Sequence, residues 1–169
     1  MKRRSFALVL ALALWNCTGR APHETPEPVP NIARTTPAKF DPTANASADL
    51  AAAVVLARAS HRRIILDVGG EWCSWCHILD QFIEAHADLG KDIARDFVWL
   101  KINFSPENEN QAFLSKYPRI PGYPHLYVLS EDGDLLHSQD TAKLELDRSY
   151  DLEKMRTFFG TWAKKQEAQ

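Results

Sequence analysis

Short apolar runs alternate with longer stretches of helical periodicity along the last 120 or so residues of the chain. The apolar runs are short and rich in β-branched and aromatic residues, which is typical of strands buried on both faces. Near the end of the series, a turn signal of acidic residues and glycine precedes one more apolar pair. We therefore expect strands at residues 63–69, 97–102 and 126–129, and a fourth strand that begins at Leu135.

Helices are predicted between and around these strands, because apolar residues recur there at intervals of three and four. Ser47 is suited to cap the first helix, which should end near Ser60. The second helix should open at Cys73 or Ser74. The others are expected at residues 88–95, 108–117 and 152–165.

This order of elements predicts an α/β fold. A right-handed βαβ unit followed by a hairpin and a closing helix gives a central mixed sheet of about four strands, flanked by helices. The chain has 169 residues, of which 45% are hydrophobic, so one domain with a substantial core is expected. The net charge of −2 gives no sign of a nucleic-acid partner, which would require a clustered basic surface.

The first 17 residues are predicted to be a signal peptide. A basic start, at residues 2–4, precedes an apolar run at residues 6–15. That run is shorter than the ~20 residues needed to span a bilayer, but it fits the apolar core of an export signal. The paired Arg3 and Arg4 also loosely resemble a twin-arginine signal, but the general secretory route requires a basic start too and is the preferred interpretation.

Cys17 follows this apolar run directly and resembles the lipidated cysteine of a bacterial lipoprotein. Leu14 fits the lipoprotein pattern, whereas Trp15 and Asn16 replace the small residues expected before the cysteine. The alternative is an ordinary signal peptide that is cleaved nearby. Lipidation would account for an odd number of cysteines in an exported protein.

Residues 18–46 are expected to form a linker. They contain six prolines and few large apolar side chains, so they cannot bury enough surface to fold and should form an extended spacer. The folded domain is then expected at residues 47–169. The sequence leaves two interpretations of this segment open: a tether between the membrane and the domain, or an N-terminal segment without a role.

Two thiols, Cys73 and Cys76, lie three residues apart at the expected start of the second helix. The N-terminus of a helix carries partial positive charge and free N–H groups, so it stabilises a thiolate at the first cysteine. The second cysteine, one turn later, lies within reach to close a disulfide. A pair in this position is typical of a redox centre, whereas a purely structural disulfide across so short a loop would add little stability.

Four local matches to a known family occur in the right order. They are the Trp-Cys-x-x-Cys motif at residues 72–76, Asp67 on the preceding strand, Lys101 on the next strand, and Gly122-Tyr123-Pro124-His125. On these matches, residues 49–165 resemble the thioredoxin superfamily, and within it the chain is most similar to exported members such as the C-terminal thioredoxin-like domain of the DsbD electron transporter. The dipeptide Ser74-Trp75 matches no common pair of the superfamily, and His125 replaces a threonine.

This resemblance assigns roles to the polar residues. Cys73 is the expected nucleophile and Cys76 the resolving thiol, which releases the partner from a mixed disulfide. Asp67 is a lone carboxylate in an apolar strand, and its burial would suit it to exchange a proton with Cys76, while Lys101 moderates its charge. The alternatives are an aspartate at the strand end that faces solvent, and a surface lysine.

The resemblance also implies a surface for partner proteins. Pro124 should be cis and packed against the disulfide, so that the backbone of Tyr123 can pair with an extended partner segment. Trp72 and Trp75 would offer apolar contacts, unless Trp72 packs on the domain. Trp99 and Trp162 are expected in the core.

Two histidines near the thiols are candidates for tuning the redox centre. As cations, His77 and His125 would stabilise a thiolate and make the disulfide more oxidising. The alternatives are a histidine on the helix surface and a histidine in a loop.

Together these features predict a thiol–disulfide oxidoreductase of the bacterial cell envelope, and reduction of the partner is the expected direction. Its partners would be exported proteins with cysteines and a membrane electron carrier, and its redox group would be the disulfide itself, with no bound cofactor or metal. Two other classes remain open: a copper or zinc module built from Cys73, Cys76, His77 and His125, and a redox-inert adaptor.

Overall fold

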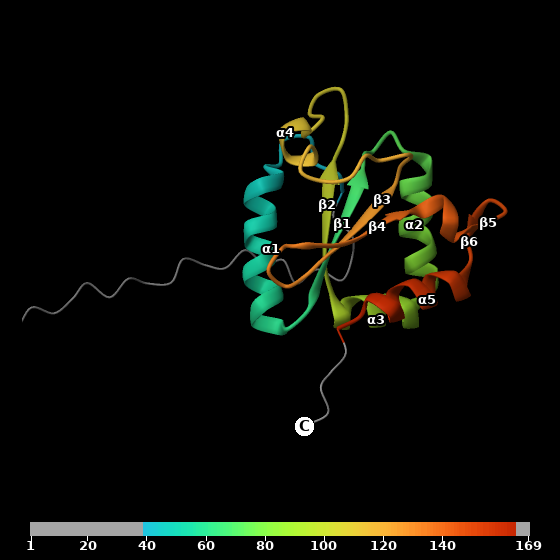
Figure 1. Ribbon diagram of the computed structural model, residues 1–169. Coiled ribbons are helices and arrows are strands. Elements are labelled where there is room, and N and C mark those ends of the chain that lie inside the picture. Colours follow the sequence, from blue (N-terminus) through green and yellow to red (C-terminus); the bar gives the residue numbers. More distant parts are fainter. Residues whose placement is uncertain (1–38, 165–169) are drawn as a thin grey trace, which may run out of the picture.

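A four-stranded mixed sheet in the order β2-β1-β3-β4 forms the centre of the protein, as the computed structural model of residues 39–164 shows (Figure 1). This α/β architecture confirms the predicted fold class. The strands of this sheet are β1 (Arg63–Gly69), β2 (Phe97–Asn103), β3 (His125–Leu129) and β4 (Leu135–Asp140). The helices are α1 (Ala46–Ser60), α2 (Ser74–Ala85), α3 (Ala87–Asp96), α4 (Gln111–Leu114) and α5 (Leu152–Trp162).

The strand register decides which polar residues share a face of the sheet. β1 pairs in parallel with β2 and antiparallel with β3, and β4 adds antiparallel to β3. Asp67 lies directly opposite Lys101 in the parallel pair, and neighbours in this position project to the same side of a sheet. Two charged residues from separate apolar strands are thereby brought together on one face.

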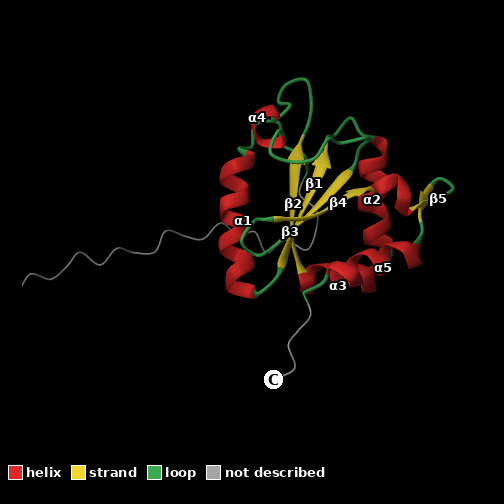
Figure 2. Ribbon diagram, in the orientation of Figure 1, coloured by secondary structure: helices red, strands yellow, loops and turns green. Residues whose placement is uncertain are grey.

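Helices cover both faces of the sheet (Figure 2). The helix α1 packs its small residues Ala53 and Ala57 on one face, against Ile64 and Leu66 of β1. On the other face α2, α3 and α5 enclose a second core that contains Ile65. Because β1 alternates between these two cores, it is apolar on both sides, as its continuous apolar sequence predicted.

Several helix boundaries differ from the predicted ones for local reasons. Asn45, and not Ser47, caps α1: its side chain accepts hydrogen bonds from the backbone N–H groups of Ser47 and Ala48. The predicted helix at residues 108–117 is reduced to the single turn α4, which follows Asn110 in a left-handed conformation. The closing helix ends at Trp162, three residues before the predicted end.

A short excursion between β4 and α5 was not predicted. It consists of a 3-10 turn at Thr141–Leu144 and a two-stranded hairpin of β5 (Glu145–Leu146) and β6 (Ser149–Tyr150). Strands of two residues leave almost no periodic signal in a sequence. The hairpin nevertheless contributes Tyr150 to the core.

The ordered domain begins before the predicted linker ends, since Phe40 is buried within it. The predicted signal peptide, Cys17 and most of the predicted linker lie outside the described residues. Within residues 39–164, no helix has the length and apolar character needed to cross a membrane.

Truncation of the central core should be costly. Ile65→Ala removes a fully buried side chain and should lower the free energy of unfolding by about 2–5 kcal/mol. Val55→Ala, on the exposed side of α1, is the matched control and should change it by less than about 0.5 kcal/mol. Urea unfolding of both variants measures the two effects, and equal losses would contradict the assignment of Ile65 to the core.

Candidate active site

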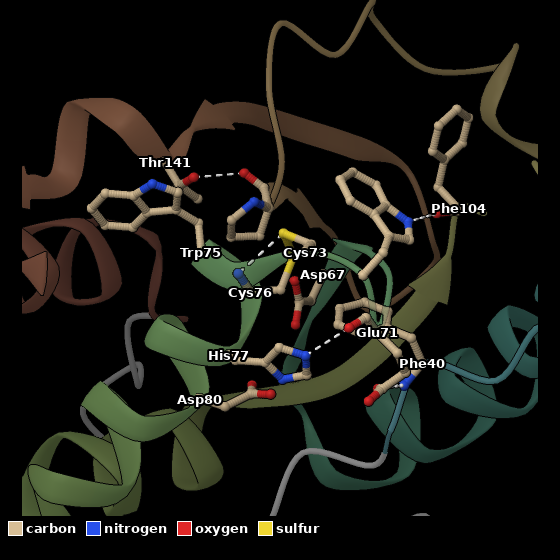
Figure 3. The surroundings of a disulfide bond; sticks show 12 residues. Phe40, Asp67, Glu71, Cys73, Trp75, Cys76, His77, Asp80, Phe104 and Thr141 are labelled. Atoms are coloured by element: carbon tan, nitrogen blue, oxygen red, sulfur yellow. Dashed lines mark hydrogen bonds between the residues drawn. A yellow bond between two sulfur atoms is a disulfide. The ribbon is translucent and has the colours of Figure 1, made fainter. Parts of the chain in front are cut away.

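A disulfide joins Cys73 and Cys76 at the N-terminus of α2 (Figure 3). Cys73 is the N-cap residue, and its Sγ accepts a hydrogen bond from the backbone N–H of Cys76 at 3.1 Å. Both cysteines are buried, Cys73 slightly less so, with exposed fractions of 4% and 1%. The order of exposure agrees with Cys73 as the thiol that meets a partner first.

The N-terminal end of α2 is electrostatically suited to a thiolate. The first turn of the helix contains no acidic residue, so nothing there offsets the partial positive charge of the free N–H groups. When the disulfide is reduced, the hydrogen bond to Sγ of Cys73 would favour the charged form of that sulfur. The site can therefore present a nucleophilic sulfur at a helix terminus.

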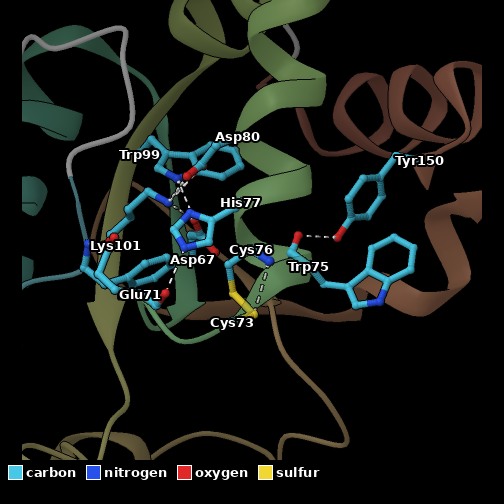
Figure 4. A network of polar contacts seen from close by, with 11 residues as sticks. Asp67, Glu71, Cys73, Trp75, Cys76, His77, Asp80, Trp99, Lys101 and Tyr150 are labelled. Carbon is cyan, nitrogen blue, oxygen red and sulfur yellow. Dashed lines mark hydrogen bonds and ion pairs between the residues drawn. A yellow bond between two sulfur atoms is a disulfide. The ribbon is translucent and has the colours of Figure 1, made fainter. Parts of the chain in front are cut away.

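Beside the disulfide lies a network of one buried cation, Lys101, and two carboxylates, the buried Asp67 and the partly exposed Asp80 (Figure 4). Nζ of Lys101 is 3.2 Å from Oδ2 of Asp67 and 2.9 Å from both carboxylate oxygens of Asp80. The Nε1–H group of Trp99 donates to the same Oδ2 at 3.3 Å, whereas Oδ1 of Asp67 has no hydrogen-bond partner among the described residues. With all three charged groups ionised, the network would carry a net negative charge.

The pKa of Asp67 is raised above its usual value, because complete burial disfavours the charged carboxylate. The attraction of Lys101 acts in the opposite direction but does not outweigh burial, while the charge of Asp80 adds to the rise. Burial also raises the pKa of Asp80, against the hydrogen bond from Lys101. Asp67 is thus a group that holds a proton more firmly than a surface aspartate.

Four residues lie where the sequence placed them in the redox centre: Cys73, Cys76, Asp67 and Lys101. The side chain of Lys101 is only 3% exposed, so both of these charged residues are buried and not part of the surface. The structure brings them together on the face that α2 covers. Their catalytic roles remain predictions.

The loop before β3 contains the cis peptide bond expected at Tyr123-Pro124. The hydroxyl of Thr141 donates to the carbonyl oxygen of Pro124 at 2.6 Å and so fixes this loop to the excursion after β4. The ring of Tyr123 stacks on Phe104 and meets Trp72 edge-on. Aromatic residues from three separate segments therefore form one surface beside the disulfide.

The two tryptophans of the motif differ in their surroundings. Trp72 is 55% exposed, and its Nε1–H group donates to the carbonyl oxygen of Phe104 at 2.7 Å. Trp75 is half-buried and packs edge-on against Tyr150 of β6. Only Trp72 thus presents most of its ring to solvent.

A mainly apolar groove of about 850 Å³ runs beside Trp72. Aromatic rings and prolines form its walls, and glutamates lie among them. Its lining includes Phe40, Trp72, Phe104, Glu71, Glu107 and Glu109. The groove could accept an extended segment next to the redox centre.

The two histidines predicted to stabilise the thiolate as cations lie in different surroundings. His125 is buried on the sheet face that α1 covers, opposite the face with Asp67, and burial lowers its pKa to about 4. It is therefore neutral at pH 7, which contradicts its predicted role as a cation. His77 is in the first turns of α2, where its Nε2 lies 2.9 Å from the carbonyl oxygen of Glu71.

The ring nitrogens bear on the metal hypothesis. Nε2 of His125 contacts the hydroxyl of Ser138 at 2.8 Å, and Nε2 of His77 is engaged with a backbone carbonyl. Within the described part of the chain, no three His, Cys, Asp or Glu side chains are grouped so that they could hold a metal ion.

Sequence reasoning missed three residues of the site: Phe40, Asp80 and Trp99. Asp80 lies four residues after Cys76, on the same face of α2, and this spacing was a usable signal. Trp99 is two residues before Lys101 on β2, so the period of a strand places both on one face. Phe40 left no signal, because it lies in a proline-rich segment with no periodicity.

The buried carboxyl of Asp67 should make stability depend on pH in a defined direction. Below about pH 4 the carboxyl is protonated in both folded and unfolded chains. Above that, the unfolded chain loses the proton while the folded protein retains it, so stability falls as the pH rises toward the raised folded-state pKa. Asp67→Asn removes this loss.

The free energy of unfolding of Asp67→Asn, minus that of the wild type, should therefore increase between pH 4 and pH 8. The increase should exceed the roughly 0.5 kcal/mol typical of surface substitutions. Urea titrations of the oxidised proteins measure it, with the exposed Asp134→Asn as the control. A difference that stays constant with pH would show that Asp67 is ionised as easily in the folded as in the unfolded chain.

Solved structures with a similar fold include proteins of disulfide chemistry. A disulphide isomerase from Xylella fastidiosa shares 23% identity with a TM-score of 0.60, over 72% of this chain and 94% of that one. The oxidised C-terminal domain of DsbD from Neisseria meningitidis shares 21% identity with a TM-score of 0.52, over 74% and 99% of the two chains. At these identities the likeness establishes the fold.

A search of curated proteins finds no match to the sequence. The family described as thioredoxin-like matches residues 44–130, a span that runs from the start of α1 to the end of β3. That span includes the disulfide, Asp67, Lys101 and the cis proline. The chain belongs to the thioredoxin-like family.

Proposed function

We propose that this protein is a thiol–disulfide oxidoreductase of the bacterial cell envelope that reduces disulfides in exported proteins. The observation that supports this most directly is the Cys73–Cys76 disulfide at the start of α2, which lies close to the buried Asp67 (Figure 3). A nucleophilic sulfur, a second sulfur within bonding distance and a proton acceptor are the three groups that disulfide exchange requires.

The reaction follows from these three groups. In the reduced protein, the thiolate of Cys73 attacks one sulfur of the partner's disulfide, and a mixed disulfide forms as the other partner sulfur leaves as a thiolate. The thiol of Cys76 then loses its proton to Asp67 and attacks Sγ of Cys73. The Cys73–Cys76 disulfide forms, the second partner thiolate leaves, and two electrons have passed to the partner.

Lys101 supports this proton exchange by its position between the two carboxylates. Its ammonium group stabilises the charge that Asp67 acquires when it ionises, and Asp80 holds that ammonium through two hydrogen bonds. The raised pKa of Asp67 makes its carboxylate a stronger base than a surface aspartate.

The partner would bind across the aromatic surface beside the disulfide. The backbone of Tyr123, before the cis Pro124, would pair with an extended segment of the partner. Trp72 would contact the same segment with its exposed ring, and Trp75 would contribute the part of its ring that is not buried. His77, which directly follows Cys76, would stabilise the thiolate of the redox centre when its imidazole is a cation.

The location and direction are supported by the sequence and by the similar structures. The apolar N-terminal run indicates export, and Cys17 is the residue at which a lipid anchor would be attached. One similar structure is a DsbD C-terminal domain, which favours a reductant that receives its electrons from a membrane carrier.

Substitution of each of the two cysteines should block a different step of the reaction. Cys73→Ser should abolish reduction of a disulfide substrate, such as insulin, because the attacking sulfur is lost. Cys76→Ser should instead accumulate a mixed disulfide at Cys73, visible on a non-reducing gel and by mass spectrometry. Val55→Ala should behave as the wild type. Full turnover by Cys73→Ser would exclude this mechanism, and failure of the wild type to react would exclude the proposed activity.

The equilibrium reduction potential should distinguish a reductant from an oxidant. We expect a value below about −230 mV, in the range of thioredoxins, because the buried His125 is neutral and does not stabilise the thiolate. Glutathione buffers with alkylation of free thiols provide the measurement. A value above about −180 mV would contradict the reductant role, and the absence of a reversible couple would favour a metal module or an adaptor.

A further inference from the structure

Phe40 contacts the redox centre although it precedes the first helix and matches no motif. Its ring lies over the ammonium group of Lys101, with Nζ 4.0 Å from the ring centroid. The ring also packs with Cys73 and Cys76 in a small apolar cluster, and the residue is only 2% exposed. One side chain therefore touches both the disulfide and the cation of the charged network.

The position of Phe40 is fixed from two sides. Its backbone N–H donates to Oε1 of Glu71 at 2.8 Å, and Glu71 lies two residues before Cys73 (Figure 3). On the other side the ring approaches Gly69 closely. A Cβ added at Gly69 would lie 3.0 Å from Cζ of Phe40 and would overlap Sγ of Cys76. The absence of a side chain at Gly69 lets the ring and the sulfur occupy this space.

The ring lies against the cation of a network that depends on the exclusion of water. Asp67 is fully buried, its Oδ1 has no hydrogen-bond partner among the described residues, and its neighbour Lys101 is almost as well enclosed. The phenyl ring of Phe40 supplies apolar surface against that ammonium and against the sulfurs. Without it, water would have a route to the ammonium and toward the carboxyl behind it.

We propose that Phe40 is a positioning residue of the redox centre: anchored by Glu71, its ring holds Lys101 in the charged network and keeps water away from Asp67 and Cys76. This inference deepens the proposed proton exchange between Asp67 and Cys76 and rests on it for its role in turnover. The enclosure of Asp67 itself is a property of the folded chain. It can be measured whether or not the protein is an oxidoreductase.

Two effects of removing the ring oppose each other. Water that reaches Asp67 would stabilise its carboxylate and lower its pKa, whereas water around Lys101 would weaken the attraction that already lowers that pKa. Burial is the largest influence on Asp67, ahead of Lys101. The relief of burial should therefore dominate, and the carboxyl should titrate at a lower pH.

The charged and titratable groups around Asp67 come from three elements. Lys101 faces it from β2 and Asp80 from α2, and the charge of Tyr150 on β6 would also interact with it. His77 acts on the network through Asp80. Since none of these groups is altered at position 40, a shift caused by Phe40 would report solvent access and the placement of Lys101.

Infrared titration of the oxidised protein tests the proposal directly. The carboxyl band present in the wild type and absent in Asp67→Asn reports the protonation of Asp67. In Phe40→Ala its midpoint should move down by about one pH unit. Phe40→Leu keeps apolar bulk over the ammonium and should stay close to the wild type. Glu71→Gln removes the charge of that residue but keeps an acceptor oxygen for the Phe40 N–H, so it should stay close to the wild type, whereas Glu71→Ala, which removes the anchor, should shift the midpoint in the same direction as Phe40→Ala.

The titration distinguishes positioning from a merely structural contribution. If Phe40 only packs, Phe40→Ala will lower the free energy of unfolding in urea while the Asp67 midpoint stays at the wild-type value, and this outcome would overturn the proposal. An upward shift would overturn it too. Insulin reduction by the wild type, measured separately, tests the proposed function. If the wild type does not reduce insulin but the midpoint shifts in Phe40→Ala, the proposed function is wrong while the enclosure of Asp67 by Phe40 is supported.

Discussion

The pairing of one buried lysine with a fully buried aspartate and a partly exposed one, close to a disulfide, is the constraint on which the rest of the site depends. A charged carboxylate without water is costly by several kcal/mol unless it is paired, and here one cation serves two carboxylates. The two carboxylates therefore carry more negative charge than the single ammonium group can balance, and this excess disappears when Asp67 retains a proton. A group that retains a proton because of its surroundings, and lies beside two sulfurs, is suited to proton transfer at those sulfurs.

The fold supplies this network through the register of its central strands. Parallel pairing of β1 with β2 places Asp67 opposite Lys101, and the helix that follows the disulfide returns Asp80 to the same face. A shift of one residue in that pairing would turn the side chains of β2 to the opposite face. In that shifted register Lys101 would lie on the face opposite Asp67, so the geometry of the active site depends on the register of the central strands.

The sequence predicted the elements with strong periodicity and the residues within the motif. The four strands and the position of Cys73 and Cys76 at a helix start were predicted from local patterns, whereas the cis proline and the placement of Asp67 and Lys101 followed from the resemblance to the thioredoxin superfamily. The prediction that His125 is a cation was wrong, because this residue of β3 is buried on the sheet face that α1 covers and burial keeps its imidazole neutral. Contacts between distant segments, such as that of Phe40, depend on tertiary packing, which local patterns do not encode.

The contact of Phe40 with the disulfide also links the site to the chain that precedes the domain. The segment before α1 was predicted as a spacer, yet its last part is held by Glu71, directly before the Trp-Cys motif. Because the hydrogen bond is donated by the backbone N–H, any residue except proline could make it at position 40, whereas a large apolar side chain is needed there to fill the space beside Gly69 and over Lys101. The enclosure of the redox centre thus depends on a residue outside its motif, so a domain truncated at the start of α1 would lack part of its own active site.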